Sequence, residues 1–319
     1  MEESFQLLVQ DVQAGDPQAK VHLARVFYEG QGVPQDYQKA YRLCLSAARQ
    51  GHLQAQQALG NLYFMGQGVG RDLKQALKWC WMAAQQGHAA AQYNIGFAYE
   101  TGQCVEQNQE KAARWYRLAA MKGHAWAQLS LAKMYFDGRG GLEKSNEKAV
   151  YWLYWAASRG LPEAQGRLGY VYHIGRGVAV NYTKAERWYR LAAEAGNVTA
   201  QYNLGCLYCF TDADLQRPES AKDWFLKAAA QGDVDAMRSL GHLYVADDLG
   251  RPDYATAVWW YRRAAEAGDQ VSMEWLGYLY SVGGHGLLPS RPEALKWYWQ
   301  LAIRGYPGAR AQIQYLQHG

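Results

Sequence analysis

Two cysteines with two residues between them, Cys206 and Cys209, are the most suggestive reactive pair in the sequence. Such a pair exchanges disulfides when it opens a helix after a strand, and it binds zinc when a second pair lies within reach. Both residues fall instead in the middle of an expected helix, and no second pair occurs. We interpret them as groove-side residues without a redox or metal role. Cys44 and Cys80 occupy a position that carries tyrosine elsewhere, which indicates packing.

Three histidines, His52, His88 and His124, recur at intervals of 36 residues. A metal ion needs ligand atoms about 2 Å away, whereas equivalent side chains in stacked helical units lie about 10 Å apart. Aspartate or asparagine occupies the same place elsewhere in the sequence. We therefore expect these histidines to begin helices, and we predict no metal site.

The pattern Ser-x-x-Lys occurs twice, from Ser130 to Lys133 and from Ser145 to Lys148. It is the acylation motif of penicillin-binding enzymes. Neither companion motif, Lys-Thr-Gly or Ser-Asp-Asn, occurs in the sequence, and Ser145 is suited to cap a helix. A penicillin-binding hydrolase is therefore the least favoured function, and we predict no catalytic residue and no cofactor.

A glycine that recurs every 36 or 37 residues reveals the elements that carry these side chains. The series is Gly15, Gly51, Gly87, Gly123, Gly160, Gly196, Gly232, Gly268 and Gly305. When each unit is numbered from the residue after its glycine, position 4 is nearly always alanine, position 8 leucine or isoleucine, position 9 small and position 12 aromatic. Positions 4, 8 and 12 lie on one face of an α-helix, which we name helix A.

A second helix, helix B, follows a Gly-x-Gly turn and a residue suited to an N-cap, and it ends at the next glycine. It contains Lys-Ala, then a tryptophan that we expect to lie in the core, then Ala-Ala. The tryptophans are Trp79, Trp115, Trp152, Trp188, Trp224, Trp260 and Trp297. Units six and seven depart from the pattern, because residues 211–213 and 247–249 replace the Gly-x-Gly turn and Arg217-Pro218 replaces the cap of unit six.

The second unit shows the full pattern, in Ala55, Leu59, Gly60, Tyr63, Gly66, Gly68, Ala76, Trp79, Ala83, Ala84 and Gly87. This pattern resembles the Sel-one-like repeat family, relatives of the tetratricopeptide repeats. The resemblance implies an all-α, right-handed α/α superhelical solenoid of eight helix-turn-helix repeats. The repeats would span 16–51, 52–87, 88–123, 124–160, 161–196, 197–232, 233–268 and 269–305, with capping helices in 1–15 and 306–319. It also implies an adaptor rather than an enzyme, with helix A lining the concave face.

The composition restricts the classes of partner that the protein could bind. Lys and Arg number 33 against 29 Asp and Glu, so the formal net charge is +4, and the charges are scattered along the chain. Nucleic-acid binding usually leaves a basic stripe, so we expect no nucleic acid. No apolar stretch approaches the roughly 18 residues of a membrane helix, and the first residues are acidic, unlike a signal peptide. These features favour a cytoplasmic protein with no membrane partner.

With positions 4, 8 and 12 buried, positions 3, 6, 10 and 14 of helix A face outward and position 13 lies at their flank. These positions differ between repeats and are rich in aromatic residues, as binding surfaces are. The predicted partner-binding residues are Arg25, Tyr28, Asn61, Phe64, Tyr93, Phe97, Glu100, Trp126, Lys133, Phe136, Tyr170, His173, Tyr202, Arg238, His242 and Tyr278. The alternative is that neighbouring helices cover part of this stripe.

The sequence thus predicts a scaffold or adaptor that binds a protein or peptide in a concave groove, with the strongest docking in repeats two to five. An RNA-binding helical array is the second reading, since repeats of this length can read one base each. That reading would require more basic charge and polar variable positions, whereas the variable positions here are largely aromatic and aliphatic.

Overall fold

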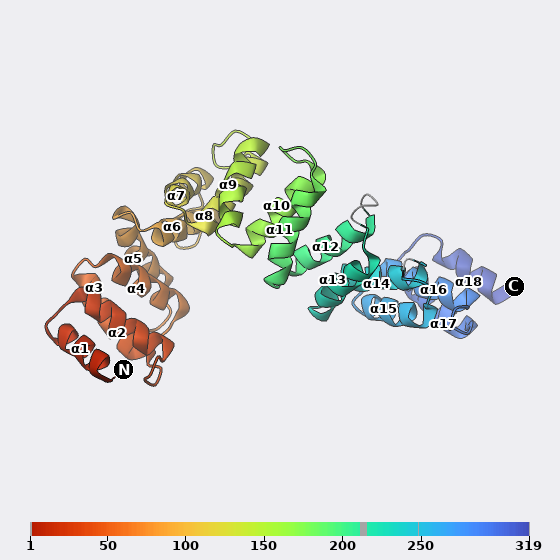
Figure 1. The fold of residues 1–319 in the computed structure, drawn as a ribbon, viewed down its shortest axis with the longest axis horizontal. Coiled ribbons are helices and arrows are strands. Elements are labelled where there is room, and N and C mark those ends of the chain that lie inside the picture. The colour runs from red at the N-terminus through yellow and green to blue at the C-terminus, as the bar shows by residue number, and fades with distance from the viewer. Residues whose placement is uncertain (1, 211–215, 248, 319) are drawn as a thin grey trace. The chain divides into compact units, whose positions relative to one another are not determined.

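The computed structural model describes residues 2–210, 216–247 and 249–318. Over these residues the chain consists of α-helices and their connections and contains no β-strand (Figure 1). One isolated β-bridge joins Gly284 and Leu287. The helices are α1 Glu2–Gln13, α2 Pro17–Glu29, α3 Tyr37–Arg49, α4 Leu53–Met65, α5 Leu73–Gln85, α6 Ala89–Thr101, α7 Gln109–Met121, α8 Ala125–Asp137, α9 Asn146–Ser158, α10 Pro162–Ile174, α11 Tyr182–Glu194, α12 Val198–Phe210, α13 Pro218–Ala230, α14 Val234–Val245, α15 Tyr254–Glu266, α16 Gln270–Val282, α17 Arg291–Ile303 and α18 Ala309–His318.

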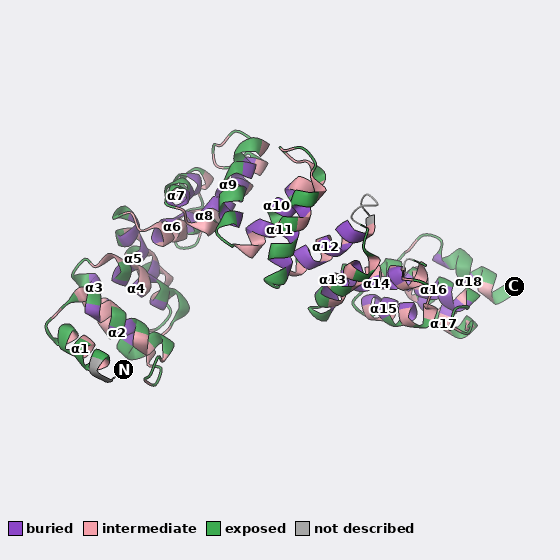
Figure 2. Ribbon diagram, in the orientation of Figure 1, coloured by how far each residue is buried: buried purple, intermediate pink, exposed green. Residues whose placement is uncertain are grey.

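The even-numbered helices α2 to α16 are helix A of the eight repeats, and the odd-numbered helices α3 to α17 are helix B. The chain forms two compact units, Met1–Ala164 and Gln165–Gly319. Within each unit a helix packs on its sequence neighbours, so successive repeats of one unit share their interior. The buried residues follow this order, lying where successive helices face one another (Figure 2).

Capping residues begin the helices where the sequence predicts. The carboxylates of Asp36 and Asp72 and the amide of Asn108 accept backbone N–H groups of α3, α5 and α7. Each satisfies donors that the first helical turn leaves without a partner. Arg217 precedes α13 without a side-chain cap bond, as the irregular sequence of unit six predicts. Ser290 differs from the prediction, because it precedes α17 without such a bond. A proline in the first turn of each helix removes one of those donors instead.

The predicted Gly-x-Gly turn forms at the end of helix A. Gly30 caps α2 with φ near 70°, in the left-handed region that favours glycine. Gly68 needs its missing side chain for a second reason, since a Cβ there would lie 2.0 Å from the carbonyl oxygen of Tyr37. The replacement turn at residues 211–213 lies outside the described residues, and so does Asp248 of the turn at 247–249.

The core contains positions 4 and 8 of helix A, which are buried in all eight repeats. Position 12 is less enclosed than the sequence suggests, because only Tyr135, Tyr208 and Tyr280 are buried and the other five rings are half-buried. The lysine of the Lys-Ala pair in helix B lies over the open side of several of these rings. Lys39 lies 5.0 Å from the centre of the Phe27 ring, for example, which is within cation–π range.

The tryptophan ladder is the clearest departure from the predicted core. Trp260 and Trp297 are buried, but Trp79, Trp115, Trp152, Trp188 and Trp224 are half-buried. The neighbouring position of helix B, position 29, takes the central place instead. Its residues are all buried: Cys44, Cys80, Tyr116, Leu153, Tyr189, Phe225, Tyr261 and Tyr298.

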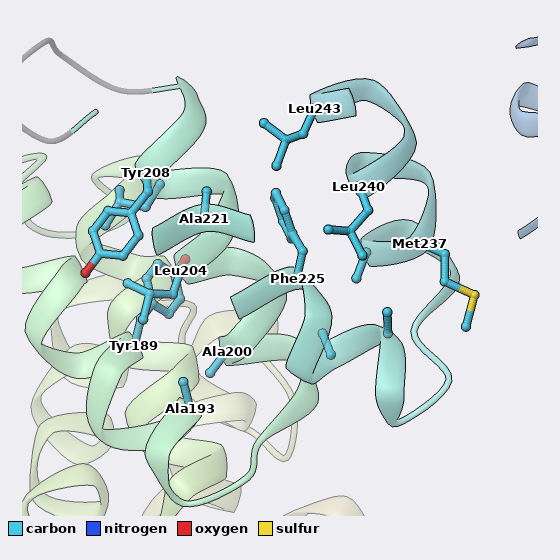
Figure 3. Packing of buried hydrophobic residues seen from close by; sticks show 14 of the residues in the cluster. Tyr189, Ala193, Ala200, Leu204, Tyr208, Ala221, Phe225, Met237, Leu240 and Leu243 are labelled. Carbon is cyan, nitrogen blue, oxygen red and sulfur yellow. The ribbon is translucent and has the colours of Figure 1, made fainter. Parts of the chain in front are cut away.

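Position 29 packs against the small residue at position 9 of the same repeat. A Cβ on Gly96 would lie 2.7 Å from the ring of Tyr116, and one on Gly205 would lie 2.5 Å from the ring of Phe225. In the C-terminal unit, Phe225 of α13 belongs to one cluster with Leu240 and Leu243 of α14 (Figure 3). The small residue therefore lets helix A approach an aromatic ring of helix B, which outweighs the helix propensity lost at a mid-helix glycine.

A buried polar seam joins successive repeats of the N-terminal unit. At position 5, the side-chain amides of Gln56, Gln92 and Gln128 donate to the carbonyl oxygens of Ala48, Ala84 and Ala120, respectively, over 3.4, 3.2 and 3.1 Å. Each bond runs from helix A back to the preceding helix B and satisfies a carbonyl at its C-terminal end. The last two repeats replace this glutamine with Met237 and Met273.

No helix in the described part of the chain combines the length and the apolar character needed to cross a lipid bilayer.

Candidate functional site

The predicted groove residues of the N-terminal unit fall into an exposed and a half-buried group. The exposed group consists of Arg25, Tyr28, Asn61, Phe64, Phe97 and Trp126, all on helix A. Tyr28 and Phe64 are each 39% exposed and Trp126 is 47% exposed, so three large rings from α2, α4 and α8 contact solvent. The structure thus leaves an aromatic stripe along the helix-A face of this unit.

The half-buried residues of this unit are held by side chains beneath them. Tyr93 stacks on the ring of His124 with centroids 4.8 Å apart and packs at a tilt against Tyr116 with centroids 5.6 Å apart. The Tyr116 hydroxyl donates to Glu100 Oε2 at 2.6 Å. Here neighbouring helices do cover part of the predicted stripe, as the alternative interpretation requires.

Lys133 and Phe136 of α8 are also half-buried. The Lys133 ammonium lies 3.9 Å from Glu163 Oε1, and the Phe136 ring packs against the core cluster that contains Met134. These two residues therefore offer a partner less free surface than Trp126 of the same helix.

In the C-terminal unit, Tyr170 and Tyr278 are the exposed members of the predicted set, at 47% and 49%. His173 and His242 are half-buried, and burial lowers the pKa of both imidazoles. Their Nδ1 atoms lie 3.4 Å and 2.7 Å from the hydroxyls of Tyr189 and Tyr261. The unprotonated nitrogen of a neutral imidazole accepts a hydrogen bond from such a hydroxyl, so each histidine links helix A to the position-29 ring beneath it.

Tyr202 and Arg238 complete the predicted set in this unit, and both are half-buried. The Tyr202 ring packs on Phe225 with centroids 5.8 Å apart. Arg238 forms ion pairs with Asp235 and Asp269, the latter at 2.7 Å. Because Asp269 also caps α16, Arg238 stabilises the junction between two repeats and has few donors left for a ligand.

The residues that resemble chemical motifs have structural roles. His52, His88 and His124 cap α4, α6 and α8, each accepting a backbone N–H on Nδ1 at 3.3 to 3.4 Å. Ser145 Oγ caps α9 by accepting the backbone N–H of Lys148. These positive roles confirm that the histidines begin helices and that Ser145 serves as a cap.

Four of the five cysteines are likewise explained by packing. Cys44 and Cys80 are buried, and burial raises the pKa of the Cys44 thiol to about 11. Cys206 and Cys209 are half-buried on α12, and burial raises the pKa of Cys206 to about 11. A thiol with a raised pKa holds little thiolate near neutral pH and is a poor nucleophile.

Two cavities open on the helix-A face of the N-terminal unit, and sequence reasoning missed both. The first encloses about 320 Å³ between α2 and α4, and Cys44 lies on its floor. The second encloses about 310 Å³ between α4 and α6, and Cys80 lies on its floor. Tyr28 and Asn61 line both. The signal in the sequence was the pair of cysteines at a position that is elsewhere aromatic or leucine.

A second aromatic surface that the sequence reasoning missed lies on helix B. Tyr151, Tyr154 and Trp155 of α9 are exposed, with Tyr151 and Trp155 ring centroids 6.4 Å apart. Trp259 of α15 is exposed at the position equivalent to Tyr151. The repeating tryptophan of helix B predicts a buried face and gives no signal for the outward positions of this helix.

Tandem helical hairpins with a variable, aromatic helix-A face define a helical-repeat protein. The family model described as Sel1 repeat matches the chain at residues 17–52, 53–88, 89–124, 127–161, 162–197, 198–233, 234–269 and 270–306. The chain therefore belongs to the Sel1 repeat family, whose members generally mediate protein–protein interactions.

Two solved structures support this assignment. One is c5321, a protective antigen of uropathogenic Escherichia coli strains with an SLR fold, which is 31% identical over 98% of this chain and 68% of that chain, with a TM-score of 0.88. The other is a Sel1 repeat protein from Oxalobacter formigenes, 34% identical over 87% of this chain and 80% of that chain, with a TM-score of 0.64. No curated protein matches the chain.

Proposed function

We propose that the protein is a non-catalytic adaptor that binds a protein or peptide segment on the helix-A face of its repeats. The observation that carries this proposal is the row of exposed aromatic side chains on that face, such as Phe64, Phe97 and Trp126. Folding does not require them there, since positions 4 and 8 and the position-29 residues already form the core. Exposed aromatic residues grouped with polar ones are typical of protein-binding surfaces.

The distribution of charge supports a protein partner over RNA. The arginine and lysine residues of this face are partly engaged within the chain, as Arg25 is with Glu29 at 2.7 Å and Arg238 is with Asp269. Binding to phosphates would need several basic side chains along one path. We also propose that the protein acts in the cytoplasm.

Affinity capture with mass spectrometry tests the proposal. The wild-type chain and the triple variant Phe97→Ala, Trp126→Ala, Tyr170→Ala serve as baits in a lysate of the source organism. We expect the variant to capture at least tenfold less partner than the wild type, because truncating an aromatic anchor typically costs about 2 kcal/mol or more of binding free energy at an interface.

The matched control is Leu118→Ala, Tyr151→Ala, Trp259→Ala, which removes exposed side chains from helix B instead. This control should capture the partner as the wild type does. If the helix-A variant captured every wild-type partner while the helix-B variant lost them, the binding surface would lie on helix B and the proposal would be wrong.

A further inference from the structure

The two cavities of the N-terminal unit have a common origin at position 29. Where this position is aromatic, the ring fills the space between successive A helices, as Tyr116 does beside Gly96 and Tyr93. Repeats one and two carry cysteine instead, and a thiol is too short to reach that space. The result is one hollow above Cys44 and another above Cys80, which are equivalent sites one repeat apart.

The cavities are suited to uncharged, apolar groups. The walls of the second include Phe64, Met65, Leu77 and Phe97, and no Asp, Glu, Lys or Arg lines it. Arg25 is the one ionic side chain that lines the first, and Glu29 already neutralises it at 2.7 Å. At about 310 to 320 Å³ each hollow lies at the lower end of ligand-pocket volumes, so each accepts one bulky side chain or ring.

The spacing of the hollows restricts the backbone that could fill both. Successive A helices lie about 10 Å apart. In a β-strand, residues three apart span about 10 Å but point to opposite faces. In a polyproline II helix, residues three apart lie on one face and are separated by about 9.3 Å. An α-helix meets the distance with residues seven apart, but its backbone groups are already paired.

Asn61 favours the polyproline II alternative over the α-helix. Its exposed side chain lies on the wall shared by both cavities and makes no side-chain hydrogen bond to the described part of the chain. A polyproline II segment leaves its backbone carbonyl groups open to such an amide. Aromatic rings such as those of Tyr28 and Phe64 also form the walls of grooves that recognise this conformation.

We infer that the two hollows bind an uncharged polyproline II peptide with two bulky apolar side chains three residues apart, one entering above Cys44 and the other above Cys80. This inference rests on the proposed function and names the partner chemistry for one part of the same face. Asn61 hydrogen-bonds to the peptide backbone between the two side chains, and Tyr28 separates them.

Selection from a displayed library of random 12-residue peptides on the immobilised full-length chain tests the inference. We expect the enriched peptides to share two bulky apolar residues three apart, with proline between or beside them. Enrichment of helix-forming peptides with apolar residues seven apart, or no enrichment at all, would overturn it.

Filling variants then link the binding to the cavities. Cys80→Tyr reproduces the combination of Gly96 with Tyr116, and Cys44→Leu reproduces that of Ala132 with Leu153, so each side chain already has a counterpart elsewhere in the fold. In fluorescence polarisation with the most enriched peptide, each variant should weaken binding roughly tenfold or more, because it excludes one anchor. Circular dichroism melting reports whether each variant folds.

Two further variants separate this inference from the general adaptor function. Asn61→Ala changes an exposed residue that the fold does not require. It should weaken the binding of the same peptide several-fold, and this test holds even if a filling variant does not fold. Leu118→Ala changes an exposed residue of helix B outside both cavities and should leave the binding of this peptide unaffected. If Asn61→Ala and the folded filling variants bound the peptide as tightly as the wild type, the helix-A face would still bind peptides but the two-cavity inference would be wrong.

Discussion

The first two repeats and the C-terminal unit use the same sequence pattern but fill the space beneath helix A differently. In the C-terminal unit, Tyr189, Phe225, Tyr261 and Tyr298 occupy position 29, and each ring packs on a glycine of helix A. In repeats one and two, Cys44 and Cys80 occupy it and cavities remain. One buried position therefore decides whether a repeat presents a closed or a hollowed surface, while the surrounding framework of alanine and leucine is unchanged.

The units also differ in the caps of helix A. Those of repeats two to four are histidines, whereas those of repeats six to eight are Asn197, Asp233 and Asp269. The position-5 seam continues in the C-terminal unit, where the Gln201 side chain donates to the carbonyl oxygen of Ala193 at 3.1 Å, and methionine replaces the glutamine in repeats seven and eight. The comparison teaches that polar contacts support both units and that the units differ in how position 29 is filled.

The largest expected effect is truncation of a position-29 ring. Phe225→Ala should destabilise the region around α13 by about 3–5 kcal/mol, because a fully buried aromatic side chain leaves a cavity that cannot collapse. Cys80→Ala should cost about 1 kcal/mol, since it removes one small group beside an existing cavity. Native-state hydrogen exchange of α13 and α5 measures the two losses. Equal losses would mean that position 29 is not packed differently in the two regions.

Acid should weaken the N-terminal unit through its histidine caps. Burial lowers the pKa of His88 and His124, and Lys122 adds to the effect on His88. A histidine with a lowered pKa in the folded state contributes stability that is present above about pH 6.5 and is lost as pH falls below it, because the unfolded chain binds the proton first. Each lost cap should cost about 1 kcal/mol.

The double variant His88→Asp, His124→Asp tests this prediction. Aspartate caps Asp233 and Asp269 already occupy the equivalent position, and a carboxylate remains an acceptor at pH 5.5. Between pH 7.5 and pH 5.5 the hydrogen-exchange protection of α6 and α8 should fall in the wild type by more than in the variant. His22→Asp, on an exposed position of α2, is the control and should not alter the loss. Identical losses in all three proteins would show that the caps are not the acid-sensitive groups.

The smallest expected effect concerns the polar seam. Gln92→Met introduces the residue that repeats seven and eight carry naturally, and it should change the free energy of unfolding by less than about 1 kcal/mol. It removes the bond to Ala84 but also removes the buried Oε1, which has no partner among the described residues. Gln92→Ala should cost more, because it leaves a cavity as well. Urea unfolding measures both losses, and a loss for Gln92→Met as large as that for Gln92→Ala would show that the hydrogen bond to Ala84, and not the filled volume, stabilises the seam.

Much of the fold was readable from the sequence because its signals are local and repeated eight times. Positions 4 and 8, the caps Asp36 and Asn108, and the left-handed glycines depend only on helix geometry within one repeat. The site was less predictable. Tyr93, Glu100 and Tyr202 were expected to face outward, but rings from the underlying helix B cover them, and that contact depends on how the two helices are rotated against each other.

The sequence by itself determined the helical hairpins, their number and their order, because each is specified by residues a few positions apart. The tertiary structure alone decided that position 29 rather than the tryptophan ladder forms the centre, and that Cys44 and Cys80 leave hollows between adjacent helices. The physical reason is that a cavity is a property of volumes contributed by three helices. A short side chain leaves a cavity only where no neighbouring side chain fills the space, and the positions of those neighbours are known only from the structure.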